Sequence, residues 1–182
     1  MALRERSFSP ESALAAVLYV LRQKGGAATV HELLKASYFA DKEHLSRFGW
    51  IGSGDRYCAM TFGPVPSHTY DLLKAAGGKR NNAPPRFVNL ARAVLDGRSY
   101  PTIRPRQAPD MSLLSPALVQ CLDVAIQKAG NWGFARRTRE SHDAAWDEAR
   151  ARWAEDGEMD MPIESIAKTL PNAPEILEHI SA

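Results

Sequence analysis

Cysteine is scarce in this chain of 182 residues, which has only Cys58 and Cys121, far apart in the sequence. A small secreted domain held together by disulfides would carry more. We therefore expect both cysteines to be small core residues, in a protein of the reducing cytoplasm.

Long hydrophobic runs are missing as well. No apolar stretch approaches 18 residues, so the sequence predicts no membrane-spanning helix. The opening residues, Met1–Arg6, mix an acid with bases, and no apolar segment follows as a signal peptide would require. The apolar fraction of 45% and the charged fraction of 24% are ordinary for a globular chain, which at this length folds without a disulfide or metal.

A strong excess of one charge is absent overall, since the net charge is +2, but the charges are unevenly placed. After Trp153 there are seven acidic residues and one lysine, a net charge of −6, which leaves +8 for the rest of the chain. We expect a domain over residues 1–154 and an acidic, helical extension over residues 155–182 packed on that same domain. One interpretation of this asymmetry is that the protein has two different surfaces, one basic and one acidic. The other is that the charges only form a solvated face at each end of the chain.

Two helices are strongly indicated near the start. Ser9-Pro10 is a typical helix beginning, and apolar residues follow at helical spacing until Gly25-Gly26. Thr29 and Glu32 form the pattern of a capping box for a second helix, which Gly49 ends.

The period then changes from helix to strand. Residues 56–62 alternate in the way of a short strand, and Ser67 is expected to cap a helix that runs to Ala76. Between them Gly63-Pro64-Val65-Pro66 is expected to stop the strand, because proline has no N–H to donate to a ladder.

After Ala76 the sequence predicts an irregular segment, residues 79–109, followed by further helices. Phe87-Val88 and Thr102–Arg104 could be strands that pair with the first one, with a short helix over residues 90–95 between them. A helix from Ser115 to Gly130, one over 134–153 with a break near Ser141, and short helices near 163–170 and 174–180 complete the chain. The expected fold is mainly α (α+β), a helical bundle with a small antiparallel sheet or hairpin.

No catalytic or metal constellation emerges from the residues. His31-Glu32 begins like a zinc-protease helix, but position 35 is lysine, so the second imidazole is missing. Gly52-x-Gly54 has neither the third glycine nor the strand-to-helix context of a nucleotide-binding loop. Asp41 and His44 share a helix face and could serve as acid and base, but such a pair is more often structural. We expect no enzyme, no cofactor and no metal.

DNA binding is the alternative function. Two helices separated by Gly-Gly, the second with a threonine cap, also open winged helix-turn-helix proteins. The second helix offers Lys35, Lys42 and Arg47 as contacts, but Asp41 and Glu43 among them dilute the positive field that phosphates require. Operator DNA therefore remains a possible partner, in a regulator or autorepressor.

One stretch of the chain carries a family resemblance. Residues 38–45, YFADKEHL, are similar to a helix of the Panacea domain, the SocA-like antitoxin family, and the similarity continues through 51–67 into the helix at 70–73. Ser141-His142 with Trp146 resembles the family's Thr-His…Trp segment, with a serine that keeps the hydroxyl. The resemblance covers residues 14–153. Its motif residues are Tyr38, Asp41, His44, Gly54, Asp55, Tyr57, Gly63, Pro64, Pro66, Tyr70, Ser141, His142 and Trp146.

The resemblance implies an antitoxin that neutralises a protein toxin encoded beside it by direct contact, and that hands the toxin to a cellular AAA+ protease in some members. It also implies a helical bundle with a small sheet, in agreement with the reading above. Because partners differ within such a family, we expect the motif to maintain the scaffold and more variable surfaces to recognise the partner.

Two hypotheses about residues follow. Asp41, His44, Asp55, Tyr57 and Tyr70 could form a polar network that fixes the second helix against the proline corner. Arginines and aromatic residues dominate protein interfaces, so the partner-binding candidates lie in the arginine-rich middle and the aromatic C-terminal third. These candidates are Arg104, Arg106, Trp132, Phe134, Arg136, Arg137 and Arg139.

Overall fold

The chain folds into helices with two small antiparallel sheets in a computed structural model that describes residues 7–156 and 159–181. This confirms the predicted mainly helical class. The helices are α1 (Pro10–Gln23), α2 (Val30–Phe48), α3 (Ser67–Ala76), α4 (Pro85–Val94), the 3-10 helix η1 (Met111–Leu113), α5 (Pro116–Ala129), α6 (Phe134–Ser141), α7 (Ala144–Asp156), α8 (Ile163–Ala167) and α9 (Ala173–Ser181).

The strands are short and fall into two sheets of three. They are β1 (Ala28–Thr29), β2 (Tyr57–Met60), β3 (Gly63–Pro66), β4 (Leu95–Asp96), β5 (Thr102–Pro105) and β6 (Asp160–Met161). One sheet has the order β1-β5-β4 and the other the order β3-β2-β6, with all pairs antiparallel.

The caps predicted for the first two helices are present. The Ser9 side chain accepts a hydrogen bond from the backbone N–H of Ser12 at the start of α1. The Thr29 hydroxyl accepts from the N–H of Glu32 while the Glu32 carboxylate accepts from the N–H of Thr29, which is the capping box of α2. Gly49 then ends α2 with a φ of 79°, a left-handed conformation that glycine adopts without strain.

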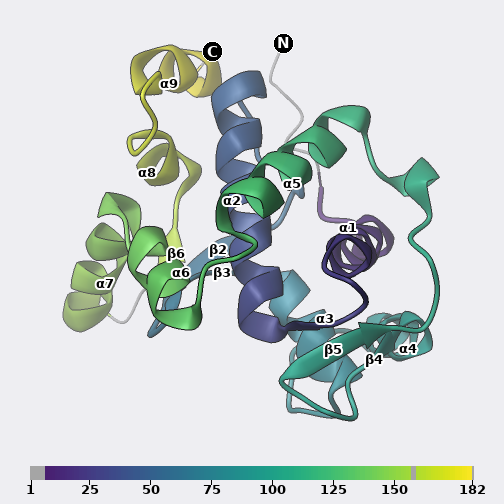
Figure 1. The fold of residues 1–182 in the computed structure, drawn as a ribbon. Helices are drawn as coiled ribbons and strands as arrows, with labels where there is room; N and C mark the ends of the chain where they lie inside the picture. The colour runs from purple at the N-terminus through teal and green to yellow at the C-terminus, as the bar shows by residue number, and fades with distance from the viewer. Residues whose placement is uncertain (1–6, 157–158, 182) are drawn as a thin grey trace.

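Helix α2 runs through the middle of the molecule, with α1, α3 and α4 on one side and α7, α8 and α9 on the other (Figure 1). Leu33, Leu34 and Ala40 of α2 belong to a core shared with α1, α3, α4 and α5. Tyr38 and Leu45 of the same helix belong to a second core with β2, α7, α8 and α9. The two cores therefore meet at one helix.

The expectation that Gly63–Pro66 could not form a strand was wrong. Pro64 lies opposite Ala59 and Pro66 opposite Tyr57 in the β2–β3 ladder. Ser67 N–H donates to the carbonyl of Arg56 at 2.8 Å, and hydrogen-bonded and non-bonded pairs alternate along such a ladder. Both prolines therefore occupy non-bonded positions on the edge strand of the sheet, where a missing N–H costs nothing.

The irregular middle also differs from expectation. Phe87 and Val88 lie in α4, which begins at Pro85, so neither is in a strand. Residues 102–105 do form a strand, but it pairs with β1 and β4 rather than with β2. The sequence pattern could not predict that β5 pairs with β1 and β4, because each of these two strands is only two residues long and shows no alternation.

The break predicted near Ser141 and the two final short helices are confirmed. The strand β6, which the sequence did not predict, pairs with β2 through Tyr57↔Met161 and Cys58↔Asp160. Ile166 and Ile176 from the following helices are buried in the second core. Among the described residues, no helix is both long enough and apolar enough to cross a membrane.

Candidate functional site

A buried carboxylate links α2 to the start of β2. Asp41 accepts hydrogen bonds from the Tyr57 hydroxyl at 2.7 Å and from the Ser53 hydroxyl at 2.5 Å and backbone N–H at 2.9 Å. Burial raises the pKa of the Asp41 carboxyl, and burial together with the neighbouring Asp41 raises the pKa of Tyr57 well above its usual range. The three groups therefore fix the loop after α2 rather than present an acid or base to solvent.

A second carboxylate, Asp55, caps helix α3 from outside that helix. Its oxygens accept hydrogen bonds from the backbone N–H groups of His68 at 3.0 Å and Thr69 at 2.8 Å, and from the Thr69 hydroxyl at 2.7 Å. The Ser67 hydroxyl instead donates to the carbonyl of Arg56, so the prediction that Ser67 caps α3 was wrong. Asp55 takes the capping role because the β2–β3 hairpin returns the chain to its side.

The network joins only part of the set suggested by the sequence. Asp41, Tyr57 and Asp55 are linked through Ser53, whose hydroxyl accepts from the N–H of Asp55 at 3.1 Å. His44 lies outside the network, since its Nδ1 is 3.0 Å from the Trp50 carbonyl. Tyr70 also lies outside it, beneath the Lys74 ammonium.

A row of polar side chains follows one face of α2: His31, Lys35, Tyr38 and Lys42. Tyr38 and Lys42 both donate to Asp143 Oδ2, at 2.7 and 2.6 Å, at the junction of α6 and α7. His31 Nε2 lies 3.2 Å from the Thr138 hydroxyl of α6. The row therefore holds α6 and the start of α7 against α2.

Lys35 is the most unusual member of this row because its side chain is almost fully enclosed, with 1% of the residue exposed. Its Nζ donates to the carbonyl of Pro64 at 2.8 Å, and burial lowers its pKa to about 7. A Cβ atom at Gly63, where φ is 104°, would lie 2.7 Å from that Nζ and 2.5 Å from the Ser141 hydroxyl oxygen. Glycine is thus required where the hairpin meets α2 and α6.

The segment Ser141-His142…Trp146 closes the same region. The Ser141 hydroxyl donates to the carbonyl of Thr138, and the Trp146 indole N–H donates to the carbonyl of Met60 at 2.9 Å. The His142 ring stacks on Trp146 at 3.7 Å between centroids, and burial lowers its pKa. These residues bind the turn between α6 and α7 to strand β2.

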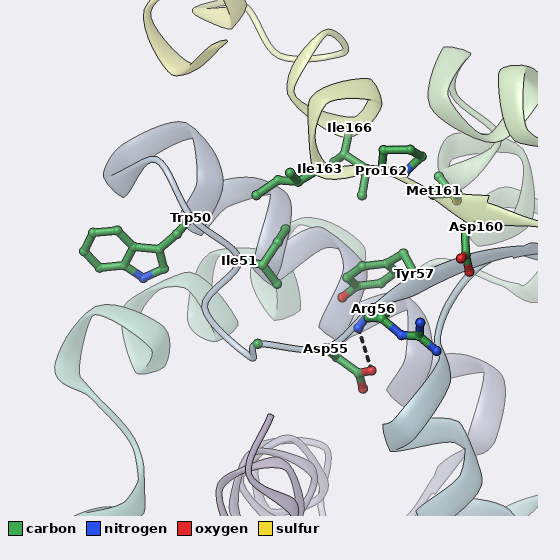
Figure 2. A pocket seen from close by; sticks show the side chains of 11 residues that line it. Trp50, Ile51, Asp55, Arg56, Tyr57, Asp160, Met161, Pro162, Ile163 and Ile166 are labelled. Carbon is green, nitrogen blue, oxygen red and sulfur yellow. Dashed lines mark hydrogen bonds between the residues drawn. The ribbon is translucent and has the colours of Figure 1, made fainter. Parts of the chain in front are cut away.

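A groove of about 310 Å³ lies between the loop before β2 and the segment from β6 to α8. Figure 2 shows Ile163 and Ile166 of α8 near Ile51, with Trp50 at one end and Arg56 and Asp160 below and beside them. Its floor contains motif residues Gly54, Asp55 and Tyr57, whereas its wall comes from residues 160–166. The wall is mostly apolar and contributes no cluster of catalytic side chains.

The partner-binding candidates separate into two places. Arg104 and Arg106 lie on and just after β5, where Arg106 donates to the carbonyl of Leu95 and approaches Asp96 at 3.9 Å. Trp132, Phe134, Arg136 and Arg139 lie together before and along α6, and all but the half-buried Trp132 are exposed.

Arg137 differs from its neighbours because it is buried, with 8% exposed. Its guanidinium donates to the carbonyl of Trp132 and lies 3.6 Å from the Glu32 carboxylate. Glu32 also pairs with Lys24 at 2.9 Å, and Lys24 donates to the carbonyl of Gly130. Arg137 thus fastens the α5–α6 loop to the start of α2.

Several residues of these sites were not singled out from the sequence. Lys35 appeared there only as a missing histidine and a possible phosphate contact. Asp143, Ser53 and Phe62 were not proposed as members of any site. The spacing 31, 35, 38, 42 is a helical one that could have been noticed, but a buried lysine cannot be told from a surface lysine by its spacing alone. Residues 160–166 carry no local pattern that predicts a groove.

Helix α2, the proposed DNA-reading helix, is enclosed by α5, α6, β3 and α8 and has nine buried residues. The fold and its internally bonded polar groups define a mainly helical scaffold with two small sheets. A comparison with family models matches residues 33–147 to the family described as "Antitoxin SocA-like, Panacea domain". The match covers more than half of the chain, so the chain belongs to the SocA-like antitoxin, Panacea domain family. No curated protein and no solved structure matches the chain.

Proposed function

We propose that this protein is an antitoxin that neutralises a cognate protein toxin by binding it directly. The observation that carries the proposal is the family match over residues 33–147, which spans the whole central scaffold from α2 to the start of α7. The toxin is taken to be the product of a gene beside that of the antitoxin.

The use of the motif side chains supports binding rather than catalysis. The motif residues Asp41, Asp55 and Tyr57 have their polar atoms bonded inside the protein and are buried, and the same holds for Lys35, which lies outside the motif. An acid, base or nucleophile must reach a substrate, and these groups are instead occupied in joining α2, β3 and α3. Recognition then falls to exposed side chains around the scaffold.

Delivery of the bound toxin to an AAA+ protease is a further step that we include in the proposal. The uneven charge of the chain supports it, with a net charge of −6 after Trp153 and +8 before it. An adaptor needs two surfaces, one for the toxin and one for the protease.

Growth rescue tests the proposal. The neighbouring gene is induced in a host cell with and without this protein, and colony formation is counted. We expect toxicity from the neighbour alone and recovery with both genes. Persistent toxicity at confirmed expression of both proteins would contradict the antitoxin function.

The lifetime of the toxin then distinguishes neutralisation by binding alone from delivery of the toxin to a protease. After protein synthesis is stopped, the half-life of the toxin is followed by immunoblot in cells with and without the antitoxin, and in cells that lack individual AAA+ proteases. Delivery predicts a shorter half-life that depends on one protease. An unchanged half-life together with growth rescue would leave binding in place and exclude delivery.

A further inference from the structure

Two aromatic side chains from distant segments meet at one place on the surface, and a third lies two residues from one of them. Phe62, at the tip of the β2–β3 hairpin, is 56% exposed, and Phe134, the first residue of α6, is 49% exposed. Their rings contact edge to face, with centroids 5.3 Å apart. Trp132 lies in the same loop as Phe134, and the three rings are called the aromatic surface below.

The aromatic surface is held in place before any partner arrives. The Phe134 ring packs on His31 of α2 with centroids 4.3 Å apart, and the Trp132 ring meets Phe39 of α2 edge to face at 5.9 Å. The guanidinium of the buried Arg137 donates a hydrogen bond to the carbonyl of Trp132. Rings that are already ordered lose little conformational entropy on binding, which is why such residues dominate interface energetics.

Positive charges border these rings. The Arg136 guanidinium lies over Trp132 at 4.4 Å, and the Lys128 ammonium lies over Phe39 at 6.0 Å. Within residues 7–156 and 159–181 neither cation has a carboxylate within salt-bridge distance, whereas Arg139 is paired with Glu140. The border is therefore cationic and ready to pair with an acidic partner.

The other large exposed aromatic residues do not form such a group. Trp50 is 41% exposed and packs on His44 and Phe48 of its own helix end, and Trp153 is 45% exposed and packs under Arg150 of its own helix. A single exposed ring needs no explanation, but rings from separate segments that touch on the surface usually mark an interface.

We propose that the aromatic surface, with Arg136 and Lys128 at its border, is where the toxin docks. The toxin meets it with an apolar side chain flanked by aspartate or glutamate. This inference rests on the proposed antitoxin function and narrows it to one face of the protein. It also assigns the buried Arg137 to positioning of the loop and leaves Arg104 and Arg106 outside the interface.

Calorimetric titration of the purified toxin into this protein tests the inference. The variants are Phe62→Ala, Phe134→Ala and Arg136→Glu, and Trp153→Ala is the matched control because it removes a ring of similar exposure elsewhere. We expect each phenylalanine variant to weaken binding about tenfold or more. The control is expected to bind like the unchanged protein.

Stopped-flow association gives a second readout for the charge. Salt is expected to slow association of the unchanged protein, and Arg136→Glu is expected to slow association at low salt and to reduce the salt dependence. Thermal unfolding of each variant checks that its fold is kept. The Arg136 side chain is exposed, so this variant still reports on the proposal if a phenylalanine variant unfolds.

The outcomes separate this inference from the function itself. If the unchanged protein binds the toxin and all three variants bind it equally well, the docking surface is wrong and the antitoxin function stands. Equal weakening by Trp153→Ala would also overturn the surface. If the unchanged protein does not bind the toxin, the proposed function fails and the surface proposal fails with it.

Discussion

At the scale of single residues, two buried side chains connect neighbouring elements through hydrogen bonds to their backbones. Asp55 replaces the missing cap of α3, and Lys35 joins α2 to the hairpin through the carbonyl of Pro64. Each satisfies backbone groups that would otherwise be buried without a partner, and such groups are expensive to leave unpaired.

Asp55→Ala is expected to destabilise the protein by about 2–3 kcal/mol, because the N–H groups of His68 and Thr69 lose their acceptor. Urea unfolding measures the change. Asp55→Asn is the control, since it keeps one acceptor oxygen and should retain part of the stability. Unchanged stability of the alanine variant would show that water replaces the carboxylate at no cost and that the network does not stabilise the hairpin.

Lys35→Met is expected to change the pH dependence of stability. The pKa of Lys35 falls from 10.5 in the unfolded chain to about 7 in the folded protein, so between these values the unfolded state binds more protons. Stability of the unchanged protein should then rise as the pH increases from 7 toward 10.5, and the cost of burying the ammonium should be complete below 7.

The methionine variant lacks this titration, so its stability relative to the unchanged protein should be highest below pH 7 and should decline by several kcal/mol toward pH 10. The lost bond to Pro64 lowers its stability by the same amount at every pH. Denaturant unfolding at a series of pH values measures the difference. A difference that stays constant from pH 6 to pH 9 would mean that Lys35 remains charged when buried.

At the scale of elements, the β2–β3 hairpin is the part whose shape depends most on its sequence. Its prolines fit because they occupy non-bonded positions, and Gly63 fits because its backbone has a φ of 104° against Lys35 and Ser141. The hairpin also carries Phe62 at its tip, so its position determines one third of the aromatic surface.

Gly63→Ala should destabilise the protein by about 2–4 kcal/mol, because a Cβ there is strained and also meets Lys35 and Ser141. Gly25→Ala is the matched control. Gly25 has a φ of 80° but open space around it, so this variant has the strain without the collisions. Thermal unfolding compares the two, and an equal loss in both would show that the contacts at Gly63 yield without cost.

The helix caps show which local features could be predicted from the sequence alone. The caps at Ser9 and Thr29 and the turn glycine Gly49 were predicted because their partners lie within a few residues. The cap of α3 was not, because its acceptor, Asp55, lies 14 residues before Thr69 and reaches it only through the hairpin. Likewise, Asp143 is joined to Tyr38 across 105 residues, a distance at which no local pattern operates.

At the scale of the whole molecule, α2 is shared by two cores. Tyr38 and Leu45 face one core and Leu33 and Leu34 the other, so neither core is complete without this helix. The last segment, residues 160–176, completes the second core through Met161, Ile166 and Ile176. We therefore propose that residues 155–182 belong to the same folding unit as the preceding chain.

Ile166→Ala tests this unity, since Ile166 is 1% exposed. We expect a loss of about 2–4 kcal/mol in one cooperative transition seen equally by far-UV circular dichroism and by calorimetry. Lys168→Ala, an exposed neighbour on the same segment, should change stability little. A separate early transition of the variant would show that the second core unfolds by itself and is a distinct unit.

The account as a whole depends on a stable complex between this protein and its toxin. The most direct measurement is co-purification: the two neighbouring genes are expressed together, only this protein carries a tag, and the eluate is analysed by size-exclusion chromatography with light scattering. We predict a single peak whose mass equals a defined complex of both chains. Elution of this protein alone, with the toxin expressed and soluble in the same cells, would contradict the account.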